Sequence, residues 1–91
     1  MKKKTGQRRH AQKRAFERYG VVMGKKQQDQ VCQLIRSNRC TLLKKQSNRV
    51  SIYKVKYEEV EFIVVYDKTR NSLATFLPKD YNIKDPYEIY D

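Results

Sequence analysis

Residues 50–77 read VSIYKVKYEEVEFIVVYDKTRNSLATFL, and this stretch decides the fold. It divides into three segments of strand length, at 50–57, 60–67 and 72–77, each rich in the β-branched and aromatic residues that favour strands. The connections between them are two and four residues long, which is too short for the crossover that parallel neighbours need. The three segments therefore predict an antiparallel meander.

The same alternation begins further upstream. Residues 40–46 are again strand-like, and only Ser47, Asn48 and Arg49 separate them from the segment 50–57, so we expect a fourth antiparallel strand. The segment 60–67 carries apolar residues on both of its faces. A strand of this kind should be central, with helices covering one face of the sheet and other parts of the chain covering the other.

Before residue 40 the apolar residues recur with helical spacing. One helix is predicted at about 7–19 and is ended by Gly20, and a second is predicted at about 28–38 after a loop at 21–26. In the first helix, Ala11, Gln12, Ala15, Phe16 and Tyr19 fall within one arc. In the second, the buried face is expected to comprise Val31, Leu34 and Ile35, with Cys32 beside them.

The predicted fold class is therefore α+β, with two N-terminal helices packed on a four-stranded antiparallel sheet. We expect Phe16, Leu34, Ile35, Phe62 and Val64 to be buried where the two layers meet.

The chain of 91 residues is long enough for one hydrophobic core and too short for two. We expect a basic, flexible arm at 1–6, a single α+β domain at 7–78 that ends near Pro78, and an acidic, tyrosine-rich tail at 79–91.

Charge is distributed unevenly along the chain. The net charge is +11, and the residues through Arg49 contribute fifteen Lys and Arg against two acids, whereas the remainder carries six against eight. A one-sided positive field of this kind is typical of a protein that neutralises phosphates, so we expect a nucleic acid as partner, and RNA in particular. The cations expected to contact it are Lys2, Lys3, Lys4, Arg8, Arg9, Lys13, Arg18, Lys44 and Lys45.

Several other classes of protein are disfavoured by the sequence. No apolar run approaches the roughly 18 residues that cross a bilayer, and no apolar stretch follows the basic N-terminus as it would in a secretory signal, so we expect a cytoplasmic protein without a membrane partner. Two cysteines and one histidine do not predict a metal site, and no motif predicts a cofactor. The element order differs from that of an RRM, and the loop between the helices is longer than a helix-turn-helix allows.

One stripe of the first helix carries groups that could act on a phosphate ester. His10, Arg14 and Arg18 are spaced four residues apart, so they project from the same side. An imidazole can exchange a proton near neutral pH while guanidinium groups hold phosphoryl oxygens. The alternative, a surface histidine within a basic helix, remains open from the spacing alone.

Two strands add further candidates. Arg49, Ser51 and Tyr53 share one face of the segment 50–57 by the period of two. Thr75 lies in the middle of the last strand, where a packing residue would more often be Val or Ile, although an ordinary β-branched strand residue explains it equally well.

Three motifs together resemble a known superfamily. They are H-A-x-x-R-x-x-x-R-x-G at 10–20, N-R-x-x-x-Y-x-V at 48–55 and V-V-Y-D-K…T-F-L-P at 64–78. This pattern is similar to small phage and toxin-type proteins of the barnase/EndoU/colicin/RelE-like superfamily of metal-independent ribonucleases, over roughly residues 8–78. The resemblance implies helices packed on an antiparallel sheet. It also implies catalytic roles for His10, Arg14, Arg49 and Thr75.

The sequence has no second histidine, so Tyr53, Lys54 or Tyr66 would have to act as the second acid or base. The leading hypothesis is an endoribonuclease in which a 2′-hydroxyl, deprotonated by His10, attacks the neighbouring phosphate and leaves a 2′,3′-cyclic phosphate. Arg14 and Arg49 would hold the phosphate, and Tyr53 or Thr75 would orient it.

The alternative is a module that binds RNA or DNA without cutting it. A third possibility is a toxin whose partner is an antitoxin, an inhibitor or a host protein, with the tail controlling access. Association with the ribosome is left open by the sequence.

Overall fold

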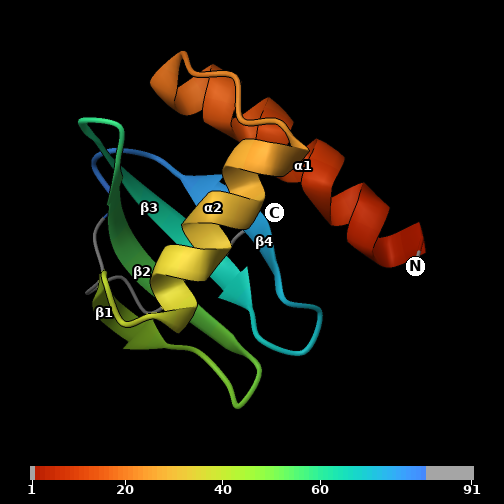
Figure 1. Ribbon diagram of the computed structural model, residues 1–91, viewed down its shortest axis with the longest axis vertical. Helices are drawn as coiled ribbons and strands as arrows, with labels where there is room; N and C mark the ends of the chain where they lie inside the picture. Colours follow the sequence, from red (N-terminus) through yellow and green to blue (C-terminus); the bar gives the residue numbers. More distant parts are fainter. Residues whose placement is uncertain (1, 82–91) are drawn as a thin grey trace.

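A four-stranded antiparallel meander forms the centre of the computed structural model, which describes residues 2–81 (Figure 1). The strands are β1 (Thr41–Lys45), β2 (Val50–Tyr57), β3 (Val60–Asp67) and β4 (Ser72–Leu77), and they lie in the order β1-β2-β3-β4. The predicted α+β fold with a meander is thus confirmed.

The turns explain why the sequence folds into this meander. Glu58 and Glu59 form the two-residue turn between β2 and β3, and both have positive φ, at 50° and 71°. This left-handed geometry matches the twist of the two strands. The longer connection between β3 and β4 ends with Asn71 at φ 52°, a conformation that asparagine adopts more readily than most residues.

The two helices are α1 (Lys2–Tyr19) and α2 (Lys25–Arg36). Gly20 ends α1 with φ 69°, and its N–H donates to the Phe16 carbonyl, as predicted for a terminating glycine. α2 begins at Lys25, three residues earlier than the sequence indicated, because the chain after Gly24 contains no residue that opposes a helix.

The beginning of the described chain belongs to α1. Residues 2–6 lie within the helix, which begins at Lys2, and the flexible arm expected at 1–6 stays a prediction. Lysine is a good helix former, and a single glycine at residue 6 lowers helix stability by only about 1 kcal/mol, so nothing in this segment stops the helix. The predicted tail at 79–91 lies, beyond Tyr81, outside the described residues.

Both helices cover the same face of the sheet. Their buried side chains, Ala11, Ala15, Val31 and Ile35 among them, pack against residues of β2, β3 and β4. The strand residues of this core include Val55, Phe62, Val64, Tyr66, Leu73 and Phe76. Within residues 2–81, neither helix has the length and apolar character needed to cross a bilayer.

The opposite face of the sheet is apolar too. Val50, Ile52, Ile63, Val65, Ala74 and Leu77 form a second buried cluster there. Among the described residues, Leu43 and Tyr81 pack against it. β3 is therefore buried on both faces, as its sequence predicted.

Phe16 was predicted to be buried but is 60% exposed. α1 turns its two alanines, Ala11 and Ala15, toward the sheet, because these small side chains let the helix approach β4 closely. Phe16 lies 100° further around the helix than Ala15 and so points away from the core. Leu34 is only half-buried for a similar reason, since α2 packs through Val31 and Ile35.

The end of α1 is fastened to the last strand by polar contacts. Arg18 donates to the Phe76 carbonyl at 2.6 Å, and the Tyr19 hydroxyl donates to the Leu77 carbonyl at 2.7 Å while accepting the Ile63 N–H at 3.0 Å. The Tyr19 oxygen thus bridges β3 and β4. Burial raises the pKa of this hydroxyl, so it keeps its proton for donation at neutral pH.

Candidate nucleic-acid interface

Two connections lie side by side at one end of the sheet. They are residues 46–49 between β1 and β2, and residues 68–71 between β3 and β4. The Lys68 N–H donates to the Arg49 carbonyl at 2.7 Å and joins them. Within the first connection, the Ser47 hydroxyl accepts hydrogen bonds from the N–H groups of Arg49 and Val50. These local hydrogen bonds stabilise the turn.

A cleft of about 470 Å³ opens between this end of the sheet and the last turn of α2. Its lining residues are Ile35, Arg36, Leu42, Lys45, Asn48, Ser51, Tyr53, Tyr66, Lys68 and Asn71. The lining thus contains three cations, Arg36, Lys45 and Lys68, and none of its described residues is acidic. None of the three cations pairs with a carboxylate of residues 6–81 either.

The polar groups of the cleft are held in place by hydrogen bonds. The Asn71 amide oxygen accepts both the Tyr66 hydroxyl, at 2.5 Å, and an Arg36 N–H. Tyr53 packs edge-on against Tyr66, with 6.3 Å between the ring centroids. Burial raises the pKa of Tyr53, and Cys40 and Tyr66 raise it further, so this phenol stays protonated at neutral pH.

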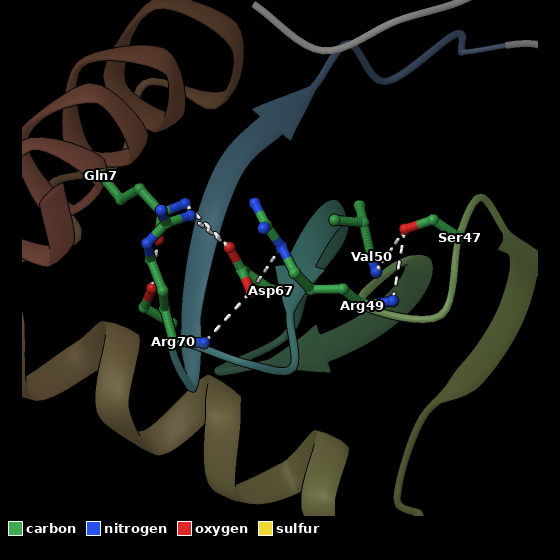
Figure 2. Close-up of polar contacts among 7 residues, drawn as sticks. Gln7, Ser47, Arg49, Val50, Asp67 and Arg70 are labelled. Carbon is green, nitrogen blue, oxygen red and sulfur yellow. Dashed lines mark hydrogen bonds and ion pairs between the residues drawn. The ribbon is translucent and has the colours of Figure 1, made fainter.

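A buried carboxylate lies beside the cleft (Figure 2). Asp67, 1% exposed, lies between the side chains of Arg49 and Arg70, and Gln7 reaches it from α1. Arg70 donates to it from its guanidinium at 2.9 Å and from its backbone N–H at 3.1 Å, and Gln7 donates at 3.2 Å. The Arg49 Nε lies 3.6 Å from the Asp67 Oδ1, and the two side chains form an ion pair. Gln7 in turn accepts the Ser72 hydroxyl.

Charge and hydrogen bonding outweigh burial at this carboxylate. Burial alone would raise the pKa of Asp67, but the hydrogen bonds from Arg70 and Gln7, together with the Arg49 charge, bring it below the ordinary value. Asp67 is therefore ionised at neutral pH. It holds two guanidinium groups at the edge of the cleft, and Arg49 remains half-exposed.

The residues predicted to be catalytic are not all brought together. Tyr53 lines the cleft, and Arg49 lies at the same end of the sheet. Thr75 is fully buried and pairs with Val65, which belongs to the face away from the helices. His10 and Arg14 lie on α1, and neither they nor Thr75 is among the described residues that line the cleft.

Two of these residues, His10 and Thr75, carry buried polar atoms that form no hydrogen bond within the described part of the chain. These atoms are the His10 Nε2 and the Thr75 hydroxyl oxygen. Arg14 instead forms an ion pair with Glu17 at 2.7 Å on the surface of α1. Their catalytic roles stay predictions from the resemblance.

The cations predicted to contact phosphate differ in where they lie and in whether another group of the protein binds them. Lys45 lines the cleft, whereas Lys44 pairs with Ile52 on the other sheet face. Arg8 is bound to Asp29 at 2.9 Å, and Arg18 to the Phe76 carbonyl. Arg9 and Lys13 are exposed on α1, whose first turn contains Lys2, Lys3 and Lys4.

Sequence reasoning missed the roles of Arg36, Lys68, Asp67, Arg70 and Asn71. One signal was available, because a meander that pairs residues 50–57 with 60–67 places Asp67 opposite Val50 and hence beside Arg49. Within residues 6–81, no group of three or more His, Cys, Asp and Glu side chains is arranged to hold a metal ion.

Comparison of the chain with protein-family models, with curated proteins and with solved structures found no match.

Proposed function

We propose that this protein binds RNA, and that the cleft between the hairpin turns and the C-terminal turn of α2 contacts the strand. The observation that carries the proposal is the set of three cations, Arg36, Lys45 and Lys68, around a pair of tyrosines with no acidic residue in the described lining. Cations without carboxylate partners are free to neutralise phosphates, and aromatic rings beside them offer surfaces for bases.

The neutral polar groups of the cleft favour RNA over DNA. Asn48, Ser51 and Asn71 supply hydroxyl and amide groups within reach of a bound strand. These groups can exchange hydrogen bonds with a ribose 2′-hydroxyl, which is the group that distinguishes the two nucleic acids. Arg49 and Arg70, held by Asp67, extend the positive surface past the edge of the cleft.

The experiment compares two double variants of equal charge. Lys45→Gln with Lys68→Gln removes two cations from the cleft, and Lys54→Gln with Lys56→Gln removes two exposed cations from the opposite face of β2. Fluorescence anisotropy of a labelled single-stranded RNA should show a larger loss of affinity for the first pair. A deoxy strand of the same sequence should bind more weakly to the parent protein. Equal losses for the two double variants would contradict the assignment of the cleft.

A second candidate function is metal-independent cleavage of the bound RNA. The Tyr53 hydroxyl in the cleft favours it, because this phenol can donate its proton to the leaving 5′-oxygen as the bond from phosphorus to that oxygen breaks, while water accepts the proton of the attacking 2′-hydroxyl. Incubation of a mixed RNA in EDTA should then yield 2′,3′-cyclic phosphate ends. The Tyr53→Phe variant should cut about 10²–10⁴ times more slowly while binding normally. RNA that is bound and remains intact would leave binding alone as the function.

A further inference from the structure

The side of α1 that faces away from the sheet combines an aromatic residue with cations. Three large hydrophobic side chains are exposed among the described residues: Phe16 at 60%, Val22 at 63% and Leu42 at 53%. Phe16 and Val22 line one shallow groove together with Arg9, Gln12 and Lys13. The groove therefore contains an aromatic ring, two cations and an amide, and none of its described lining residues is acidic.

In the part of the chain that the structure describes, three arginines of α1 are bound to other groups of the protein, whereas Arg9 and Lys13 are not. Arg8 is bound to Asp29, Arg14 to Glu17, and Arg18 to a backbone carbonyl of β4. Arg9 and Lys13 form no ion pair with another residue of the described chain, and both flank Phe16. The acid nearest in sequence, Glu17, is already neutralised by Arg14.

The groove is also preformed. The connection between α1 and α2 runs back beside α1, and Val22 lies on it (Figure 1). Fully buried Met23 anchors this connection, and the buried Gln28 amide donates to the Met23 carbonyl at 2.8 Å and to the Arg8 carbonyl at 3.1 Å. Little ordering of the protein would accompany binding here, which favours affinity.

We propose that this groove, defined by Arg9, Gln12, Lys13, Phe16 and Val22, is a second RNA contact, in which an unpaired base stacks on Phe16 and its flanking phosphates meet Arg9 and Lys13. The proposal rests on the RNA binding proposed for the cleft. Aromatic rings interleaved with cations are the usual means of holding single strands without sequence preference. A protein partner fits less well, because the centres of protein interfaces are depleted in charge, and in lysine especially.

The chain contains no tryptophan, so Phe16→Trp introduces a single reporter at the groove. Titration with single-stranded oligoadenylate should quench its emission as a base stacks on the indole. The matched control is Thr41→Trp, an exposed position of β1 that pairs with Lys54 on the sheet face opposite the cleft, and its emission should change little.

Affinity measured by anisotropy gives the second readout. Phe16→Ala should weaken oligoadenylate binding roughly 5- to 150-fold, the range that loss of one base–aromatic stack produces. Phe16→Leu should lose nearly as much although it stays apolar, and Phe16→Trp should retain the parent affinity. The double variant Arg9→Gln with Lys13→Gln should lower the steepness of the log affinity against log salt plot by about 0.7 per cation.

The experiments distinguish failure of the groove proposal from failure of the proposal that the cleft binds RNA. If the Lys45 and Lys68 variants weaken binding while Phe16→Ala binds as the parent does and Phe16→Trp is not quenched, the cleft stands and the groove does not bind RNA. An equal effect of Phe16→Leu and Phe16→Trp would also overturn stacking. If the parent protein binds no RNA, both proposals fall.

Discussion

Replacing Asp67 with asparagine should destabilise the protein although the two side chains have nearly the same shape. The carboxylate is 1% exposed and is ionised between Arg49 and Arg70. Asparagine can still accept the Arg70 backbone N–H through its amide oxygen. Its NH₂ group would then replace the carboxylate oxygen that accepts both the Gln7 amide and the Arg70 guanidinium, and two donors, the NH₂ group and the guanidinium, would meet without a hydrogen bond.

The magnitude follows from what each partner contributes. The Arg70 guanidinium at 2.9 Å is a charge-assisted hydrogen bond in a part-buried position, and loss of such a bond costs about 2 kcal/mol. Arg49 adds little to this figure, because its side chain is 50% exposed and 3.6 Å away, so solvent screens the pair. For a domain of this size, about 2 kcal/mol corresponds to a decrease in Tm of roughly 8–16 °C.

The assay is thermal and urea unfolding followed by circular dichroism, with Glu61→Gln as the control. Glu61 lies on the same strand but is exposed, and its replacement makes the same change in net charge. The lowered pKa of Asp67 sets the pH dependence. A carboxylate whose pKa falls on folding stabilises the protein above its unfolded pKa of about 4, and this stabilisation is lost as pH falls through the folded value. The difference between parent and variant should be constant from about pH 5 to 8 and shrink below about pH 4.

Two results would refute the reasoning. The first is an Asp67→Asn protein as stable as the Glu61→Gln control at pH 7. The second is a stability difference that does not shrink as the pH is lowered below the unfolded pKa of about 4.

The remaining predictions concern RNA binding and the core. Asp67→Asn should weaken RNA binding although it makes the protein more positive, because Arg49 and Arg70 lose their common anchor; tighter binding in an anisotropy titration would show that overall charge governs affinity. Tyr19→Phe should cost about 1–3 kcal/mol in urea unfolding, since it leaves the Ile63 N–H and the Leu77 carbonyl unpaired. Tyr57→Phe, which loses only an exposed contact to Gln30, should change stability much less. Val64→Asp should prevent folding, as judged by circular dichroism, because it places an unpaired charge at a fully buried position.

The strands could be predicted from the sequence because their signals are local. The bounds of β2, β3 and β4 agree with the predicted segments, since each is a short alternating or apolar run bounded by polar residues such as Glu58, Glu59 and Asn71. The start of α1 could not be located in the same way, because Lys2 begins the helix without a capping signal.

The burial of α1 and the candidate site depend on contacts between distant residues. Phe16 was assigned to the core because helical spacing places it in one arc with Ala11 and Ala15, whereas in the fold only the small alanines of that arc lie against β4. Gln7 and Asp67 are 60 residues apart, so nothing local in either segment indicates that they meet. Tyr53 and Arg49 were chosen for their face of one strand, and the structure adds their neighbours from other elements, notably Arg36 and Asn71.

The attachment of α1 to β4 has a consequence for how the chain folds as it is synthesised. Arg18 and Tyr19 bond to carbonyl groups 58 residues further along the chain. At ribosomal rates of about 5–20 residues per second, the helix emerges roughly 3–12 s before the strand that receives it. During this interval α1 has no docking surface, and its alanine face stays in water. The β1–β2 and β2–β3 hairpins can pair as they appear, so α1 is expected to join the folded domain after strands that are made later than it.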